Sequence, residues 1–326
     1  MRRLAVLLSL VLIPILAMPA HSQAKTRKPH ARAKAHKWAV VLHGGAGVIE
    51  RSSMSPQVEQ QYREGLRQAI TAAGAILNKG GSAVDAVQAA IEIMEDNPLF
   101  NAGRGSVFAA DGTNQMDAAI MDGATMKAGA VADVQHTRHP IALARAVMDK
   151  TQWVLLTGTG ADAFSVHAGL QQEPRSYFFT ESRWQALIKE LKKENLPIPP
   201  RPRGVPPPPA SGRARARFGN GYIELPDNHN YGTVGVVALD QHGNVAAGTS
   251  TGGLTAKRWD RIGDSPLIGA GTYASNQSCA VSGTGIGEYF IRYTVARTIC
   301  ALVQYKHMRL QAAAYQVIQT QLAPIH

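Results

Sequence analysis

Cysteine is scarce in this chain. Only Cys279 and Cys300 occur among 326 residues, so neither a disulfide framework nor a cysteine-rich zinc site is expected. An exported protein can pair two such cysteines, but a chain of this length needs no disulfide to fold, and we therefore expect two buried free thiols. Neither residue has an activating partner nearby in the sequence, which leaves a cysteine nucleophile unsupported.

Several cofactor motifs are also missing. The sequence has no Cys and His cluster at zinc-ligand spacing and no P-loop. Gly283, Gly285 and Gly287 follow a GxGxG pattern, which argues against the GxGxxG turn of dinucleotide-binding proteins. Hydrophobic residues make up 45% and charged residues 17% of the chain, enough to fill one sizeable core.

The longest apolar run near the N-terminus is too short to span a bilayer comfortably. Arg2 and Arg3 precede the apolar run 4–17, and small residues follow up to Ala24. This pattern predicts a signal peptide over residues 1–24, with a permanent anchor as the alternative. We expect a secreted protein without a stable membrane anchor after signal removal, periplasmic if the host is a Gram-negative bacterium.

Acidic residues are missing from two basic segments. Residues 1–37 hold eight Lys and Arg, residues 201–217 hold five Arg, and neither segment holds an Asp or Glu. The formal net charge is +11, so the rest of the chain carries a small negative charge. We therefore expect no specific nucleic-acid partner, only weak, salt-dependent contacts between the basic segments and polyanions. Residues 25–37 form a basic, flexible N-terminal segment in this interpretation.

The Pro- and Arg-rich segment 196–232 predicts a disordered linker. It ends at Gly232, and at Thr233 an apolar strand pattern begins abruptly. This edge indicates that Thr233 becomes a new N-terminus. A hydroxyl nucleophile needs a base, and a freed α-amine with a pKa of roughly 7.7 to 8 supplies one. The alternative is an ordinary threonine that opens a strand.

Later residues supply the remaining parts of a site. The turn signal 240–244 predicts a hairpin whose second strand places Thr251 beside Thr233. Arg261 and Asp264 suit the carboxylate and ammonium of an amino-acid-like substrate, with an exposed loop ion pair as the alternative. The run SGTGIGE at 282–288 exposes N–H groups at a helix start, where an oxyanion is stabilised.

These motifs together resemble the plant-type asparaginase and isoaspartyl peptidase family of N-terminal-nucleophile hydrolases. The resemblance covers residues 38–160 and 232–303. Seven runs match in order: HGGAG (43–47), NPLFNAGRGSVF (97–108), MDAAIMDG (116–123), GTVGVVALD (232–240), GNVAAGTSTGG (243–253), RIGDSPLIGAG (261–271) and SGTGIGE (282–288). It implies an α+β fold, a four-layer αββα sandwich, matured into an α subunit (38–195) and a β subunit (233–326) that pair as a dimer of heterodimers.

The resemblance also implies the residue roles. Thr233 is the nucleophile, freed by self-cleavage after Gly232, Thr251 hydrogen-bonds it, and Thr284 with the N–H of Gly285 forms the oxyanion hole. Four residues bind the substrate: Arg261 at its α-carboxylate, Asp264 at its α-ammonium, Gly287 in the pocket wall and Asn101 beside the nucleophile.

No catalytic cofactor is implied, but a structural sodium ion is. Its ligands are the main-chain oxygens of Met94, Glu95, Asn97, Phe100, Ala102 and Arg104.

The implied reaction is hydrolysis of β-aspartyl dipeptides and of the side-chain amide of asparagine. A glycosylasparaginase-type amidohydrolase is an alternative, although that group carries Asp before the nucleophile and TGDGD at the oxyanion motif, where this chain has Gly232 and TGIGE. An exported binding protein without catalysis is an alternative from another class. Family members continue past the last matched helix with a further strand pair, so we also expect a fold that lacks C-terminal strands.

Hydrophobic periodicity predicts the main elements. The predicted strands are 38–42, 106–109, 116–121, 127–134 and 153–156, and the predicted helices are 57–77, 82–95, 140–148, 161–167, 181–195, 288–304 and 310–322.

Overall fold

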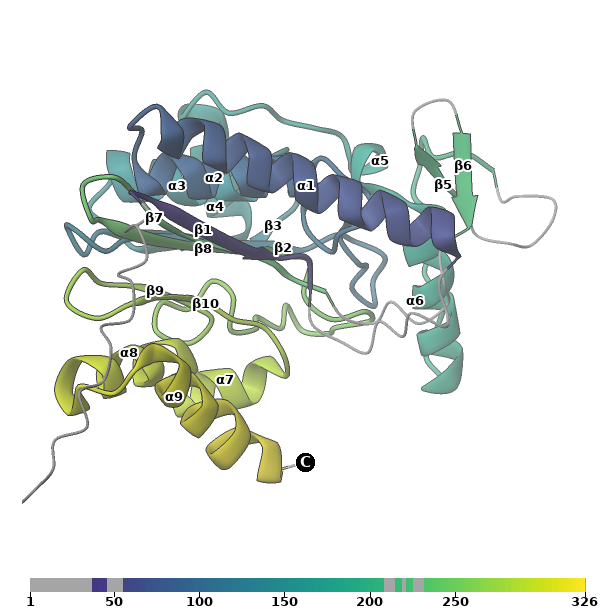
Figure 1. Cartoon of the computed structure of the whole chain (residues 1–326). Coiled ribbons are helices and arrows are strands. Elements are labelled where there is room, and N and C mark those ends of the chain that lie inside the picture. The colour runs from purple at the N-terminus through teal and green to yellow at the C-terminus, as the bar shows by residue number, and fades with distance from the viewer. Residues whose placement is uncertain (1–36, 46–54, 208–214, 219–220, 225–231, 326) are drawn as a thin grey trace, which may run out of the picture. The chain divides into compact units, whose positions relative to one another are not determined.

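A computed structural model describes residues 37–45, 55–207, 215–218, 221–224 and 232–325 (Figure 1). The predicted signal peptide, nearly all of the basic segment 25–37 and part of the linker lie outside these residues. Among the helices that the structure describes, none is long and apolar enough to cross a membrane.

The described chain is a mixed arrangement of helices and mostly antiparallel strands. The strands are β1 (Ala39–His43), β2 (Met116–Asp122), β3 (Ala128–Val134), β4 (Leu155–Thr157), β5 (Arg215–Phe218), β6 (Gly221–Glu224), β7 (Val234–Leu239), β8 (Val245–Thr251), β9 (Thr272–Ala274) and β10 (Ala280–Ser282). The α-helices are α1 (Pro56–Asn78), α2 (Ala83–Glu95), α3 (Pro140–Lys150), α4 (Gly158–His167), α5 (Arg175–Phe178), α6 (Glu181–Lys193), α7 (Gly287–Tyr293), α8 (Val295–Lys306) and α9 (Leu310–Tyr315), and a π-helical turn follows at Gln316–Leu322.

The central sheet has the strand order β1-β7-β8-β2-β3-β4. All neighbours pair antiparallel except β3 and β4, which run parallel. The hairpin of β7 and β8 therefore lies inside the sheet, between β1 and β2. Side chains on both faces of β8 are buried, which explains its run of small residues (VAAGTST).

Helices cover one face of this sheet, and a small sheet lies against the other. Helices α1, α2 and α3 pack on the first face, while β9 and β10 lie on the opposite face with α7, α8 and α9 beyond them (Figure 1). Helix α2 packs closely on β8, because a Cβ added at Gly248 would lie only 2.6 Å from Val87. Two apolar clusters fill the spaces above and below the sheet.

Helix α2 begins and ends as its sequence predicts. Ser82 caps the helix by accepting a hydrogen bond from the Asp85 amide at 3.1 Å, and Asp85 adds a negative charge in the first turn. The buried face consists mainly of alanine, valine and isoleucine, which permits close packing on the sheet. This helix carries the following loop, 96–105, to the edge of the sheet where Thr233 lies.

Three predicted elements differ from the structure. Residues 106–109 form a loop rather than a strand, because Asn101 and Asn114 bond the main chain of Ser106 and Val107 in place of a neighbouring strand. The predicted helix 288–304 is two helices, broken at Thr294 in the left-handed region (φ 44). The break lets the first amides of α8 donate to the carbonyls of residues 269 and 270.

The third difference concerns the linker. Strands β5 and β6 pair antiparallel inside the segment that we predicted to be disordered throughout. The sequence between them, Gly219 and Asn220, is of the type that favours a two-residue hairpin turn. The prediction of disorder rested on composition alone, which does not detect a short hairpin.

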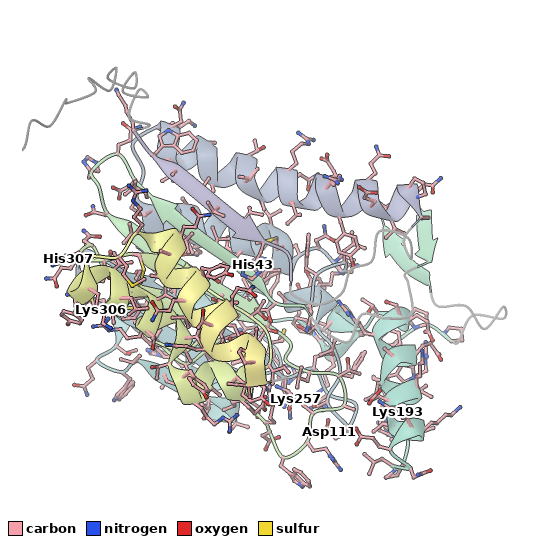
Figure 2. All side chains as sticks on the ribbon, turned by 60° about the horizontal axis from the view of Figure 1, so that its bottom comes forward. His43, Asp111, Lys193, Lys257, Lys306 and His307 are labelled. Carbon is pink, nitrogen blue, oxygen red and sulfur yellow. A yellow bond between two sulfur atoms is a disulfide. The ribbon has the colours of Figure 1, made fainter. Side chains whose placement is uncertain are left out.

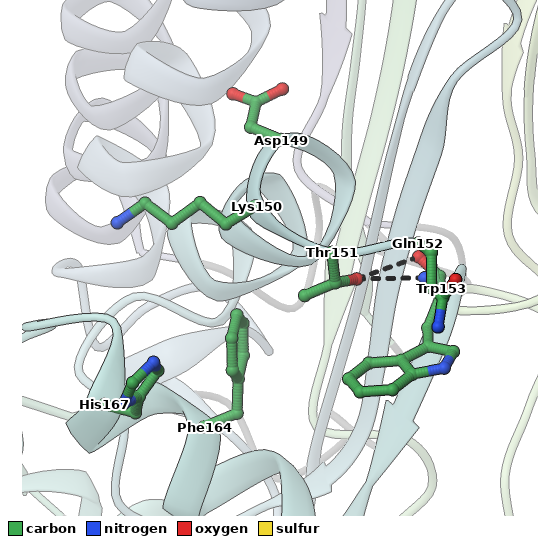
Figure 3. A pocket seen from close by; sticks show the side chains of 7 residues that line it. All are labelled: Asp149, Lys150, Thr151, Gln152, Trp153, Phe164 and His167. Atoms are coloured by element: carbon green, nitrogen blue, oxygen red, sulfur yellow. Dashed lines mark hydrogen bonds between the residues drawn. The ribbon is translucent and has the colours of Figure 1, made fainter.

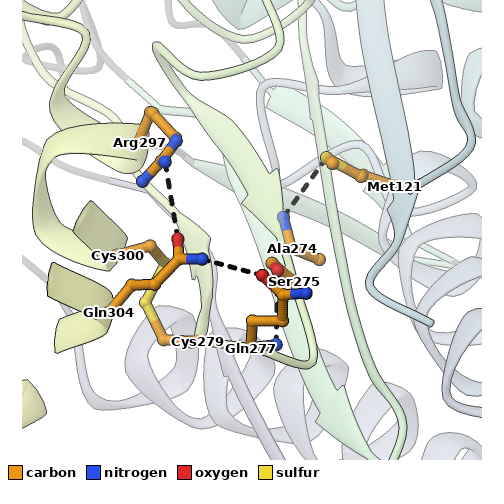
Figure 4. The surroundings of a disulfide bond; sticks show 8 residues. All are labelled: Met121, Ala274, Ser275, Gln277, Cys279, Arg297, Cys300 and Gln304. Carbon is orange, nitrogen blue, oxygen red and sulfur yellow. Dashed lines mark hydrogen bonds between the residues drawn. A yellow bond between two sulfur atoms is a disulfide. The ribbon is translucent and has the colours of Figure 1, made fainter. Parts of the chain in front are cut away.

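The prediction of free thiols is wrong. Cys279 and Cys300 form a disulfide with 5.4 Å between their Cα atoms (Figure 4). Cys279 precedes β10 and Cys300 lies in α8, so the bond fastens the helix layer to the small sheet. The sequence did not reveal this pairing, because the contact arises only when α8 packs against β9 and β10.

We predict that this disulfide stabilises the fold by about 2 to 4 kcal/mol, since it closes a loop of some twenty residues in the unfolded chain. Urea unfolding with and without a thiol reductant measures the difference. The double variant Cys279→Ala with Cys300→Ala serves as the control, because its unfolding midpoint should be the same with and without the reductant. An unchanged midpoint for the parent chain in reductant would contradict the prediction.

Candidate active site

The register between β7 and β8 brings two threonines together. Val234 pairs with Ser250, so Thr233 and Thr251 face each other at the end of the hairpin. Asp240 holds the turn at the other end by accepting bonds from the amides of His242 and Asn244 at 2.9 and 3.0 Å. As a result the Thr233 hydroxyl donates a hydrogen bond to the Thr251 hydroxyl at 2.9 Å, and both side chains are buried.

The Thr251 hydroxyl has two further contacts. It accepts a bond from the Gly253 amide at 3.0 Å and donates to the carbonyl oxygen of Gly232 at 3.4 Å. The same hydroxyl therefore orients the Thr233 side chain and polarises the carbonyl that precedes it. In the continuous chain the Thr233 nitrogen is a peptide amide, which is not a base.

Two residues enclose Gly232. A Cβ added at Gly45 would lie 3.0 Å from the Cα of Gly232, and a Cβ added at Gly232 would lie 3.2 Å from the Cβ of Asn101. Asn101 is held by the Val107 amide, which donates to its Oδ1 at 2.9 Å, and by its own Nδ2, which donates to the Gly253 carbonyl at 2.9 Å. The structure thus places Asn101 beside the Gly232–Thr233 bond. The contact from Gly45 was not foreseen.

The predicted oxyanion residues follow β10. Gly283 and Gly285 pack on the ring of Phe290, where an added Cβ at either position would lie 2.8 Å from a ring carbon. Within the described residues the side chain of Thr284 makes no hydrogen bond, so its hydroxyl is free to donate. The end of β10 touches β7, because Ser282 Oγ occupies the space that a Cβ at Gly235 would need. The loop and the Thr233 strand therefore meet, although Thr233 and Thr284 themselves make no direct bond.

Arg261, Asp264 and Gly287 also lie together. A Cβ added at Gly287 would lie 2.7 Å from Nη2 of Arg261 and 3.1 Å from Oδ1 of Asp264. The missing side chain thus leaves space between a cation and a carboxylate. Arg261 forms a bidentate pair with Glu288, with bonds of 2.9 and 3.0 Å. The sequence did not indicate this pairing, because the two residues are 27 positions apart in the chain.

The carboxyl group of Asp264 is buried and incompletely satisfied. Its Oδ2 has no hydrogen-bond partner among the described residues. Burial raises the pKa of Asp264 to about 6, against the attraction of Arg261, which lowers it. A buried carboxylate without a partner is costly. A cation entering this space would supply the partner that the protein lacks.

A second buried charge pair supports the turn after Thr251. Lys257, which is labelled in Figure 2, donates to the carbonyl oxygen of Gln115 at 3.0 Å and lies 3.8 Å from Oδ2 of Asp117. Its Nζ would be 3.2 Å from a Cβ added at Gly253, so it packs directly against that turn. We did not single out either residue. The one available signal was a lysine directly after a run of mostly small residues.

The run Gly248–Gly252 also fits the GxSxG spacing of a hydrolase nucleophile elbow. The geometry excludes that function for Ser250. This serine lies inside β8, is fully buried, and donates to Oε1 of Glu95 at 2.6 Å. A nucleophile elbow instead exposes its serine at a strand-to-helix turn.

The loop 94–104 has the chemistry to hold a hard cation. The carbonyl oxygens of Glu95 and Phe100 lie against Gly103 and Gly105, since a Cβ at either glycine would collide with them. In the described chain no group of three or more His, Cys, Asp or Glu side chains could ligate a metal, so the donors here would be main-chain oxygens. Such oxygens are hard ligands. The guanidinium of Arg183 braces the same loop through the carbonyl of Gly105 at 3.0 Å.

One hollow on the surface is lined by none of the predicted active-site residues. It lies beside the end of α3 and the start of β4, where Trp153, Phe164 and His167 face it (Figure 3). Thr151 orders this turn by accepting a bond from the Trp153 amide at 3.0 Å.

Comparison with known proteins identifies the family of this chain. A family model described as "Asparaginase" matches residues 36–326. The chain belongs to the asparaginase family. It is accordingly a hydrolase of the N-terminal-nucleophile class, as its motifs predicted.

Three relatives show the extent of the similarity. The chain is 42% identical over 286 residues to the isoaspartyl peptidase of Escherichia coli K12, with 88% of this chain and 83% of the relative aligned. It is 41% identical over 288 residues to the plant-type L-asparaginase of Pyrococcus abyssi, with 88% and 86% aligned. It is 44% identical over 258 residues to the isoaspartyl peptidase/L-asparaginase of Rattus norvegicus, with 79% and 68% aligned.

The buried Glu95 gives a stability prediction. Burial raises its pKa from 4.5 to about 8, so the folded protein holds an extra proton through that window. The free energy of unfolding should then fall as the pH rises from about 4.5 to 8, with a slope approaching ~1.4 kcal/mol per pH unit. Denaturant unfolding at several pH values in this range measures the free energy of unfolding. Glu95→Gln should flatten its dependence on pH, whereas Glu92→Gln, on the same helix, should not. The same pH dependence in the parent and both variants would refute the raised pKa of Glu95.

Proposed function

We propose that the chain cleaves itself between Gly232 and Thr233 and then hydrolyses the side-chain amide of asparagine and β-aspartyl dipeptides. The observation that carries this proposal is the 2.9 Å hydrogen bond between the hydroxyls of Thr233 and Thr251, directly after Gly232. The names of the relatives, isoaspartyl peptidase and L-asparaginase, support the substrate class.

Self-cleavage would use the groups around Gly232. The Thr233 hydroxyl oxygen attacks the Gly232 carbonyl carbon, the peptide C–N bond breaks, and an ester forms while the nitrogen takes up a proton. Water then hydrolyses the ester, which leaves a carboxylate at Gly232 and a free amine at Thr233. The Thr251 hydroxyl, 3.4 Å from the carbonyl oxygen, stabilises the charge that develops there. Glycine at position 232 tolerates the distorted backbone that this step demands.

Turnover would then follow an acyl-enzyme route. The Thr233 hydroxyl attacks the side-chain carbonyl carbon of the substrate while its own amine takes the proton. The Thr284 hydroxyl and the Gly285 N–H hold the oxyanion. The amine returns the proton to the leaving group, which departs as ammonia from asparagine or as an amino acid from a β-aspartyl dipeptide. Water hydrolyses the ester and releases aspartate.

Substrate recognition would fall to the charged pair around Gly287. Arg261 would bind the substrate α-carboxylate, in competition with its present partner Glu288. Asp264 would bind the α-ammonium and so acquire the partner that its buried Oδ2 lacks. Gly287 leaves the room for both contacts, and Asn101 would fix the reacting end near Thr233.

We further propose the structural setting of this reaction. A sodium ion held by the main-chain oxygens of Met94, Glu95, Asn97, Phe100, Ala102 and Arg104 would stiffen the loop that carries Asn101. The helix and sheet layers would form the four-layer αββα sandwich, and two cleaved chains would pair as a dimer of heterodimers, both by family resemblance. Export after removal of residues 1–24 is supported by the Cys279–Cys300 disulfide, because disulfides persist in oxidising compartments.

Replacement of the nucleophile tests the proposal. We predict that Thr233→Ala stays a single chain and loses asparagine and β-aspartyl dipeptide hydrolysis by on the order of 10³-fold or more. The parent should give two fragments on denaturing electrophoresis, with Thr233 first in the smaller one by Edman degradation. Thr233→Ser, which keeps a hydroxyl, serves as the control and should still cleave. Full activity in an uncleaved parent chain, or in Thr233→Ala, would refute the mechanism.

The raised pKa of Asp264 gives a pH prediction. The carboxyl is protonated below pH 6, where it cannot pair with an ammonium group. The KM for asparagine should therefore rise as the pH falls below 6, by approximately tenfold per pH unit. Asp264→Asn should show a high KM that no longer depends on pH in this range. Asp260→Asn, in the same loop, should keep the parent profile, and a flat parent KM down to pH 5 would contradict this role for Asp264.

A further inference from the structure

Lys257 is a buried cation to which the proposed reaction gives no role. Its side chain is 2% exposed, and the side chain of Asp117 beside it is fully buried. The ammonium donates to the carbonyl oxygen of Gln115 at 3.0 Å and lies 3.8 Å from Oδ2 of Asp117. A buried ion pair adds little to stability on balance, because both groups give up their contacts with water. The surroundings of the lysine therefore bear on what it does.

The side chain of Lys257 packs on the main chain of Gly253. A Cβ added at Gly253 would lie 3.1 Å from Cδ and 3.2 Å from Nζ of the lysine. Gly253 has φ +78, in the left-handed region, which glycine adopts without strain. The lysine can therefore lie directly against the turn that follows β8.

The main chain of this turn holds two residues of the proposed site. The Gly253 amide donates to the Thr251 hydroxyl at 3.0 Å, and the Gly253 carbonyl oxygen accepts a bond from Nδ2 of Asn101 at 2.9 Å. The amide of Gly252 also donates to the Asn101 carbonyl oxygen, at 3.2 Å. Thr251 in turn accepts the hydrogen bond of the Thr233 hydroxyl. A displacement of Gly253 would therefore move both Thr251 and Asn101.

The ammonium of Lys257 is held from the side of β2. Gln115, whose carbonyl oxygen accepts its hydrogen bond, directly precedes this strand. Asp117 pairs with Thr251 in the register of β2 and β8, and its Oδ1 accepts a bond from the Asp133 amide of β3 at 2.9 Å. Lys257 thus joins the start of β2, inside the central sheet, to the turn after β8.

We propose that Lys257 is a positioning residue, which fixes the turn at Gly253 against the start of β2 and so sets where the Thr251 hydroxyl lies. The amide group of Asn101 is held by the same turn. Lys257 acts through the main chain and takes no proton in the reaction. This inference rests on the proposed function and adds a residue to it.

Removal of the ammonium should affect the chemical step more than substrate binding. Lys257→Met keeps an unbranched stem without the charge. A shift of about 1 Å in a reacting group costs on the order of 10²-fold in rate, so we expect kcat for asparagine per cleaved chain to fall by about 10- to 100-fold. KM should change by less than about twofold, because Arg261 and Asp264 lie on another segment.

A double variant separates positioning from stability. Lys257→Met leaves the buried Asp117 carboxylate without its cation and should lower the thermal unfolding midpoint. Lys257→Met combined with Asp117→Asn removes both charges and should restore the midpoint. Asp117→Asn keeps the oxygen that accepts the Asp133 amide. The kcat of the double variant should nevertheless stay low, because the ammonium is still missing. If Lys257→Met does not fold, the double variant alone decides the test.

Leu187→Ala is the matched control. Leu187 is buried in the apolar cluster that also holds Ala256, so this variant loosens the packing next to Lys257 and leaves the ammonium in place. Electrophoresis counts the cleaved chains of every variant. Low kcat in both Lys257 variants, or a folded double variant that stays uncleaved, supports the inference if Leu187→Ala cleaves and turns over like the parent. Parent-like kcat in either Lys257 variant, or an equal loss of kcat in Leu187→Ala, would overturn it. An uncleaved and inactive parent chain would instead refute the proposed function itself.

Discussion

The register of one hairpin determines the chemistry available to this molecule. Because Val234 pairs with Ser250, the residues just beyond them, Thr233 and Thr251, meet as a hydrogen-bonded pair of hydroxyls. A slip of one residue would turn every side chain of β7 to the other face of the sheet. The register is secured at the turn by Asp240 and along the strands by burial on both faces of β8.

Space left by glycine defines the rest of the site. Gly232 and Gly45 approach each other next to the bond that we propose is cleaved, and Gly287 leaves a gap between Arg261 and Asp264. Gly253 gives room to the side chain of Lys257. At each of these positions a side chain would fill the space that a reacting group or a positioning group needs. These glycines contribute to the site by letting the backbone approach closely, and they supply no functional group of their own.

The sequence predicted those parts of the site that depend on local pattern. The apolar strand pattern that begins at Thr233 and the turn residues 240–244 were sufficient to place Thr251 beside Thr233, and the structure confirms that contact. Contacts between segments that lie far apart in the chain could not be predicted from the sequence. The Arg261–Glu288 pair, the Lys257–Asp117 pair and the Cys279–Cys300 disulfide each join elements whose meeting depends on packing. The break at Thr294 was missed for the same reason, because the loop at 269–270 imposes it.

Buried carboxyl groups are concentrated around this site at a cost in stability. Burial raises the pKa of Glu95, Asp117 and Asp264, so each is an acid that the fold holds partly against its preference for water. Such groups persist where function needs a polar or charged group away from water, and other interactions must offset the free-energy cost of burying them. Here the small, tightly packed residues between α2 and β8 and the disulfide on the opposite layer provide that stability. The rigid hairpin therefore fixes where Thr233 points, and the buried carboxyl of Asp264 leaves an oxygen without a partner, which a substrate ammonium would supply.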